Sequence, residues 1–250
     1  MYGGELIYHT KDKYGVIEVI EQQQAIRSLH FGNKTQQSAM LLANPFVLIH
    51  KYAQAMLFPT CFTEPKNVLI LGLGAGSLVK HLYNYFTHTN IDAVELRIGV
   101  IKVARDYFLL PEPDERFKLF NESAFDWLSN TTATEKYDLI IVDMFLTTGS
   151  GNDICIEAET CIQEIYKLLT KNGVATFNHL GGDIYSYSSF HTLSSVFSNN
   201  LYTIDIESTN TIIYASRGNA LPGYPVEQLN TLEKQFSLPF TNYSKKLVKV

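Results

Sequence analysis

The stretch NVLILGLGAGSLVKHL, residues 67–82, decides the fold of this chain. Its first residues form a continuous apolar run, which is typical of a β-strand that is buried on both faces. Gly72, Gly74 and Gly76 follow at alternate positions, and an amphipathic segment with helical spacing comes next. Glycines at such a turn allow a tight bend and let backbone N–H groups approach a ligand closely. The stretch therefore predicts a β-turn-α unit that binds a ligand at its turn.

The rest of the chain alternates between strand-like and helix-like segments. Strands are predicted at 91–96, 116–121, 137–145 and 173–180, and helices at 77–86, 99–110, 123–130, 157–170 and 183–199. Two final strands, at 201–208 and 211–217, are expected to form a hairpin that adds an antiparallel strand to the sheet. This alternation predicts an α/β fold with a doubly wound, mostly parallel sheet of the Rossmann type.

The two ends of the chain differ from this pattern. Residues 1–42 contain the alternating strands YGVIEVIE and AIRSLHFGN and predict a small antiparallel β domain. A helix is expected over 43–59, capped by Asn44 and ended by Pro59. We expect the Rossmann-type domain to span residues 43–250. A last helix, within residues 221–250, is expected to pack on its surface.

The composition excludes several classes of function. The 250 residues are 46% hydrophobic and carry a net charge of −5 with no long basic run, so nucleic acid is not an expected partner. No apolar stretch is long enough to span a membrane. The three cysteines, Cys61, Cys155 and Cys161, show no metal-ligand spacing and are expected to be reduced in a cytoplasmic protein. The histidines also lack the clustering that a metal site requires.

Glu95 gives the glycine turn a chemical interpretation. It ends the strand that follows the turn, where a carboxylate accepts hydrogen bonds from ribose hydroxyls. Glu122 and Ser123 follow the third strand, where an adenine edge can be read. Ser77 stands where dinucleotide sites prefer a third glycine, which favours an S-adenosylmethionine-type ligand over NAD. The alternative is a glycine turn that only packs the helix on the sheet.

Asp143 ends YDLIIVD, another strongly apolar strand. A carboxylate at the carboxyl end of a central strand lies at the ligand crevice of this fold. Such a group can act as a general base or hold an ammonium group. The alternative is an aspartate that caps a helix or anchors a loop.

Together these motifs resemble the spermidine/spermine synthases. YGVIEVIE, QQSAM, EPKNVLILGLGAGSL, IDAVEL, DERFKLFNESAFDWL and YDLIIVD occur in the family's order, and the match is closest to a bacterial branch with a GLGxGS motif. The resemblance implies a methyltransferase-like Rossmann fold and aminopropyl transfer from decarboxylated S-adenosylmethionine to a polyamine, leaving methylthioadenosine. It also implies a homodimer through the N-terminal strands.

The resemblance also assigns roles to individual residues. By position in the family's motifs, Asp143 activates the acceptor amine, Glu95 binds ribose, Gln37 lies near the donor, and Tyr52 lines the acceptor site. No tightly bound cofactor is implied, because the adenosyl compound is a co-substrate. The segment GSGNDI, 149–154, corresponds to the family's gate over the substrate, although an ordinary surface loop is an equal alternative.

Several residues depart from the family pattern. Ala75 stands where classical members have an aspartate that contacts the donor's amine, and Leu146 replaces an aspartate that holds an acceptor ammonium. Ser123 replaces an aspartate of the adenine motif, and Arg97 replaces an acid. A buried ammonium without partners costs several kcal/mol, roughly, so other carboxylates must substitute. The candidates for this substitution are Asp153, Glu157 and Asp183.

Two other functions stay open on these departures. Ala75 and Arg97 are compatible with a small-molecule methyltransferase that uses intact S-adenosylmethionine, with Arg97 accepting its carboxylate. The missing acids are also compatible with a catalytically degenerate nucleoside-binding protein.

Overall fold

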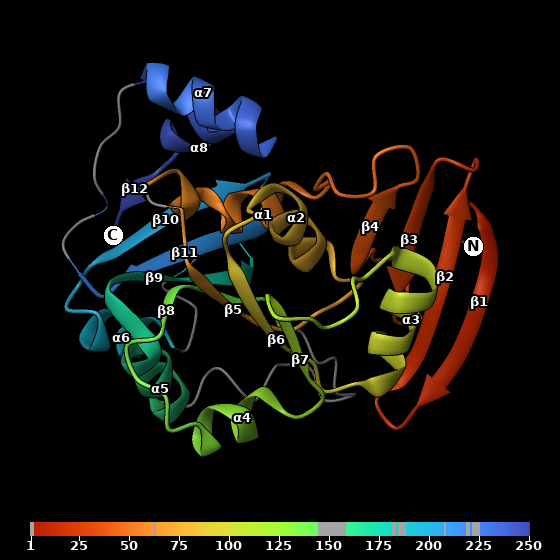
Figure 1. Cartoon of the computed structure of the whole chain (residues 1–250), viewed down its shortest axis with the longest axis horizontal. Helices are drawn as coiled ribbons and strands as arrows, with labels where there is room; N and C mark the ends of the chain where they lie inside the picture. The colour runs from red at the N-terminus through yellow and green to blue at the C-terminus, as the bar shows by residue number, and fades with distance from the viewer. Residues whose placement is uncertain are drawn as a thin grey trace.

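A computed structural model of the chain describes residues 3–62, 64–144, 159–181, 184, 189–207, 209–218, 221 and 226–250. Its strands form two separate sheets (Figure 1). The smaller sheet comes from the N-terminal part of the chain and the larger one from the rest. The predicted fold class, a mostly parallel α/β sheet with a small N-terminal β-sheet, is confirmed.

The small sheet is a four-stranded antiparallel meander. Because its strands alternate, Ile17, Val19 and Leu29 point to one face, where they pack with Val100 and Val103 of a helix. That helix also sends Ile101 and Ala104 into the core of the large sheet, so it lies between the two sheets (Figure 1). The elements are β1 (Glu5–Asp12), β2 (Gly15–Gln22), β3 (Ile26–His30), β4 (Ser38–Leu41) and the helix α3 (Ile98–Phe108).

The large sheet has the strand order β12-β10-β11-β9-β8-β5-β6-β7. The strands from β7 to β9 are parallel, whereas β11, β10 and β12 are antiparallel. The predicted closing hairpin is therefore present. The strands are β5 (Asn67–Leu71), β6 (Asn90–Val94), β7 (Phe117–Phe120), β8 (Tyr137–Val142), β9 (Leu169–Leu180), β10 (Leu201–Ile206), β11 (Asn210–Ser216) and β12 (Val248–Lys249).

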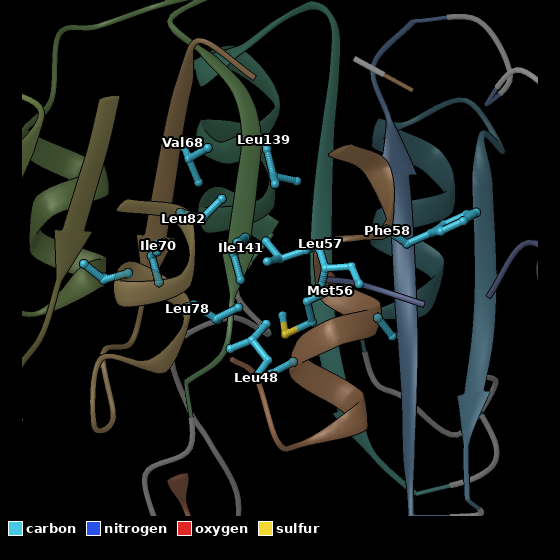
Figure 2. Packing of buried hydrophobic residues seen from close by; sticks show 14 of the residues in the cluster. Leu48, Met56, Leu57, Phe58, Val68, Ile70, Leu78, Leu82, Leu139 and Ile141 are labelled. Atoms are coloured by element: carbon cyan, nitrogen blue, oxygen red, sulfur yellow. The ribbon is translucent and has the colours of Figure 1, made fainter. Parts of the chain in front are cut away.

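Helices cover both faces of this sheet, which explains why the central strands β5 and β8 are apolar at nearly every position. Val68 and Ile70 of β5 pack with one group of helices, and Leu69 and Leu71 pack with the other. Figure 2 shows the first group, where side chains of β5 and β8 meet Leu78, Leu82, Met56 and Leu57. The helices are α1 (Lys51–Met56), the 3-10 helix η1 (Phe58–Cys61) and α2 (Ser77–Tyr85) on that face, and α4 (Ala124–Asn130), α5 (Glu159–Leu168) and α6 (Phe190–Val196) on the other.

The C-terminal segment forms more structure than the single helix that the sequence predicts. It folds into α7 (Val226–Phe236), α8 (Phe240–Ser244) and β12, which pairs with β10 and forms the edge of the large sheet (Figure 1). Proline cannot continue a helix, and Pro239 precedes the second helix. Phe58 of η1 packs against Tyr214, Phe240 and Tyr243, which attaches this segment to the core.

The helix predicted over 43–59 is wrong at its start. The structure is not helical before Lys51, and His50 has an extended backbone, with φ −73° and ψ 126°. Leu48 is buried and the chain around it forms the wall of a cavity, so tertiary packing determines the conformation here. Pro59 lies inside η1 rather than ending a long helix.

The order of the strands determines where a ligand can bind. The chain leaves β5 toward β6 on one side, while β8 lies on the other side. In open α/β sheets such a switch point creates a crevice at the carboxyl ends of the strands. No helix in the described part of the chain is long and apolar enough to cross a membrane. The domain boundary at residue 42 stays a prediction.

Lys80 provides a test of the packing between the small sheet and α2. It is only 2% exposed, its Nζ lies 3.1 Å from Met40 Sδ, and burial lowers its pKa to about 8. We expect Lys80→Met to raise the free energy of unfolding at pH 7 by about 1–3 kcal/mol, since the folded state no longer buries an ammonium.

This gain in stability should decrease as the pH rises from about 8, where Lys80 of the folded wild-type protein loses its proton, toward 10.5, where Lys80 of the unfolded chain loses it too. Urea denaturation at both ends of this range measures it. Lys102→Met, at an exposed position of α3, is the control. An equal gain at neutral and alkaline pH would contradict this explanation.

Candidate functional site

A cavity of about 670 Å³ lies at the carboxyl ends of the parallel strands. Its wall combines the turn after β5, the ends of β6, β8 and β9, the start of β11, and the segments before β4 and α1. The residues that line it include Gln37, Ser38, His50, Tyr52, Gly72, Gly74, Glu95, Arg97, Ser123, Asp143, Asn178, Thr209 and Asn210. Seven of the nine site residues that the sequence predicts thus gather in one cavity, and the two that do not line it are Gly76 and Glu122.

The glycines of the turn allow unusually close backbone contacts. Gly72 has φ +95°, and a Cβ at this position would lie 2.3 Å from the carbonyl oxygen of Asp143. A Cβ at Gly74 would lie 2.6 Å from Ser38 Oγ. Gly76 has φ +72° but faces Leu110, and it is not among the lining residues. The first two glycines therefore bring β8 and β4 against the turn.

The Glu95 carboxylate is buried and holds two loops together. Its Oε2 accepts a hydrogen bond from the backbone N–H of Leu73 at 3.0 Å, and its Oε1 accepts one from Arg97 at 2.8 Å. Burial raises its pKa, although these backbone donors oppose the effect. A carboxylate has about four acceptor positions, so capacity remains for the two hydroxyls of a ribose.

Arg97 is bound to the small sheet. Its Nε and Nη2 lie 3.0 Å from the two carboxylate oxygens of Asp12, and its guanidinium lies 4.5 Å from the centre of the Phe31 ring. Burial opposes the charge of Asp12, but the hydrogen bonds from Arg97 lower the pKa of this carboxyl. Arg97 therefore connects the hairpin of β1 and β2 to the end of β6.

Asp143 follows β8 and lies against the glycine turn. Its backbone N–H donates to the carbonyl of Leu71 at 2.9 Å, and its Oδ1 accepts a hydrogen bond from Asn178 Nδ2 at 2.9 Å. Burial raises the pKa of Asp143 to about 6, although the hydrogen bonds from Asn178 and Tyr52 lower it. A carboxylate with this pKa is ionised at neutral pH and is a stronger base than an ordinary aspartate.

Tyr52 brings α1 into the same site. Its hydroxyl is within hydrogen-bond reach of the Asp143 carboxylate and of the carbonyl oxygen of Gln37, which is 3.3 Å away. The imidazole of His50 stacks on the Tyr52 ring with 5.6 Å between the centres. The His50 Nε2 is buried and has no hydrogen-bond partner among the described residues, and His50 is one of the residues that line the cavity.

The opposite end of the cavity is less polar. Leu96, Ser123 and Ala124 line it near Glu95. Glu122, which the sequence predicts at the adenine edge, is half-buried and is not among the lining residues. This end suits a flat, largely apolar ring with few hydrogen bonds.

The cavity is also lined by residues to which the sequence predictions give no role: Ser38, His50, Asn178, Thr209 and Asn210. Asn178 lies near the end of a predicted strand, which is the signal that could have identified it. Ser38 directly follows Gln37 in the motif QQSAM, which is a second such signal, whereas His50, Thr209 and Asn210 give none. Leu146, Asp153, Glu157, Asp183 and the segment 149–154 lie outside the described residues.

Comparison with known proteins identifies the family. The model of the spermine/spermidine synthase domain matches residues 49–217. This chain belongs to the spermine/spermidine synthase family. The polyamine aminopropyltransferase of Neisseria meningitidis serogroup A is 30% identical over 205 residues, which cover 80% of this chain and 76% of that protein. That of Chromobacterium violaceum is 32% identical over 179 residues, covering 71% and 67%.

Solved structures share the fold. A probable spermidine synthase from Corynebacterium glutamicum gives a TM-score of 0.75 at 16% identity, covering 92% of this chain and 87% of that one. Human methyltransferase-like protein 13 in complex with SAH gives 0.64 at 24% identity, covering 76% and 94%. The methyltransferase-like Rossmann fold of this family member is therefore shared with enzymes of different chemistry.

Substituting Gly72 tests whether the site depends on the close approach of β5 and β8. We expect Gly72→Ala to lower the free energy of unfolding by about 3 kcal/mol or more, because the methyl group collides with the Asp143 carbonyl. Chemical denaturation measures this loss.

Gly15→Ala is the matched control. Gly15 has φ +122° but open space around its Cα, so this variant suffers backbone strain without a collision. Its expected loss is about 1–2 kcal/mol. If the free energy of unfolding falls by the same amount in both variants, the close contact between Gly72 and the Asp143 carbonyl does not constrain the residue at position 72.

Proposed function

We propose that this protein transfers an aminopropyl group from decarboxylated S-adenosylmethionine to a polyamine or another amine acceptor. The observation that carries the proposal is the Asp143 carboxylate, held with a pKa of about 6 in the cavity that Glu95 also lines. Membership of the family and the names of its relatives support the same reaction.

The donor's nucleoside fits the half of the cavity around Glu95. In this proposal the Glu95 carboxylate accepts hydrogen bonds from the ribose hydroxyls, while Leu96, Ser123 and Ala124 surround the adenine. Gly72 and Gly74 give the sulfonium-bearing arm of the donor room to pass along the turn. The arm then directs its sulfonium toward Asp143 and Gln37.

The chemistry is a substitution at the carbon attached to sulfur. The acceptor nitrogen donates its lone pair to this carbon, and the C–S bond breaks with its electron pair going to the sulfonium. The products are a new C–N bond and neutral methylthioadenosine. Asp143 takes the proton that the nitrogen loses, and Tyr52 and His50 border the acceptor. The protein supplies position and a base.

The methyltransferase alternative loses one of its supports. It requires a cation for the carboxylate of intact S-adenosylmethionine, and Arg97 was the candidate. Arg97 is instead paired with both oxygens of Asp12. The other alternative, a catalytically degenerate nucleoside-binding protein, is tested by the Asp143 experiment below. A homodimer through the small sheet and a cytoplasmic location stay predictions.

Asp143→Asn tests the assignment of the base. We expect the rate of aminopropyl transfer to fall by about 10²–10⁴-fold, because the amide accepts no proton. Binding of methylthioadenosine, measured by isothermal titration calorimetry, should change little. In the wild-type protein kcat/KM should rise with pH through about 6, as Asp143 becomes ionised. Unchanged activity of the variant would contradict the assignment of Asp143 as the base, and absence of transfer by the wild-type protein would favour the non-catalytic alternative.

The choice of donor separates aminopropyl transfer from methyl transfer. We expect titration with decarboxylated S-adenosylmethionine to show at least tenfold tighter binding, roughly, than titration with the carboxylated form. The reason is that the described cavity offers the carboxylate no free cation, and a buried unpaired charge is costly. Tighter binding of intact S-adenosylmethionine would instead favour methyl transfer over aminopropyl transfer.

A further inference from the structure

A line of three polar side chains leads from Asp143 across two neighbouring strands. Asn178 Nδ2 of β9 donates to Asp143 Oδ1 at 2.9 Å. Asn210 Nδ2, at the start of β11, donates to Asn178 Oδ1 at 2.8 Å. Thr209 Oγ1 lies 3.1 Å from Asn210 Oδ1 and also 3.1 Å from the carbonyl oxygen of Ile206, so its single proton is shared between two acceptors. Both amide donors in this line are aimed toward the carboxylate.

The strand pairing brings these side chains together. Asn178 lies two residues before the end of β9, and in the antiparallel register it is paired with Ile212, while Asn210 is paired with Leu180. The two asparagines are thus diagonal neighbours on the same face of the sheet, a separation that long side chains can bridge. Both also line the cavity.

The hydrogen bonds fix the orientation of each amide. If the Asn178 amide were turned over, its oxygen would face the Asp143 carboxylate and its NH₂ would face the NH₂ of Asn210. Both contacts are repulsive, so each amide supports the orientation of the next. The line therefore resists reorientation more than a single hydrogen bond would.

The other groups around Asp143 do not replace this function. Tyr52 of α1 offers one hydroxyl, which the Gln37 carbonyl also attracts. The remaining titratable groups that line the described cavity are His50, Glu95 and Arg97. Arg97 is neutralised by Asp12, and Glu95 bears the same charge as Asp143. The Asn178 amide is therefore a major donor that favours the charged carboxylate.

We propose that Asn178 and Asn210 are positioning residues, which together hold the Asp143 carboxylate in its charged form and in one orientation. Asn210 acts only through Asn178, because it is Asn178 that contacts the carboxylate. This inference rests on the proposed function for its catalytic meaning, but the arrangement itself can be measured without turnover.

The test is a double-substitution cycle that follows Asp143 directly. Protein labelled with ¹³C at the aspartate carboxyl carbons is titrated by NMR, and the Asp143 signal is identified by its loss in Asp143→Asn. We expect Asn178→Leu to raise the pKa of Asp143 from about 6 to about 7. Asn210→Leu should raise it by a smaller amount, and the variant with both substitutions should match Asn178→Leu alone.

Thr211→Val is the matched control. Thr211 lies beside Asn210 and its hydroxyl donates to Asp205, outside the line of amides. It should leave the pKa of Asp143 unchanged, and thermal denaturation checks that all variants are folded. The acid limb of kcat/KM should move with the NMR value.

Two results would overturn the inference. One is an Asp143 pKa that does not respond to Asn210→Leu in the wild-type background. The other is that Asn210→Leu shifts the Asp143 pKa by the same amount whether or not Asn178 has been replaced by leucine. That result would mean that Asn210 acts on Asp143 directly. If the cycle holds while decarboxylated S-adenosylmethionine gives no transfer, the proposed function fails and the positioning role stands.

Discussion

The site depends on one close backbone contact, where Gly72 meets the carbonyl of Asp143. At this point the backbone of the turn also bonds to the next strand, since the Gly72 N–H donates to the carbonyl of Val94 at 2.9 Å. A residue with a Cβ would separate β5 from β8. Because the contact is between backbone atoms, it fixes the position of Asp143 relative to the glycine turn.

Much of this arrangement could be predicted from the sequence. The apolar run before Gly72 and the acids that end the next strands are local patterns, because parallel strands end at the same edge of a sheet. Glu95 and Asp143 were accordingly assigned to one crevice. The resemblance to a family added Gln37 and Tyr52, which lie in segments with no comparable local pattern.

What the sequence could not give depends on contacts across elements. Asn178 and Asn210 meet only through the register of β9 and β11, and a shift by one residue would turn one of them to the other face. The segment 43–50 has helical spacing, yet it forms turns and bends, because Leu48 packs into the core and Ile49 and His50 line the cavity. Arg97 suggested a partner for the ligand, whereas its partner is Asp12 from a distant hairpin.

The Arg97 contact has a consequence for the molecule as a whole. The backbone of Arg97 steadies Glu95, and its side chain holds the hairpin of β1 and β2, so one residue serves both the nucleoside end of the cavity and the small sheet. If ligand binding at Glu95 and the packing of the small sheet are coupled through Arg97, each favours the other by the same free energy. The small sheet therefore shapes the ligand cavity in two ways, through Arg97 and through Gln37 and Ser38 at its last strand, which form part of the wall.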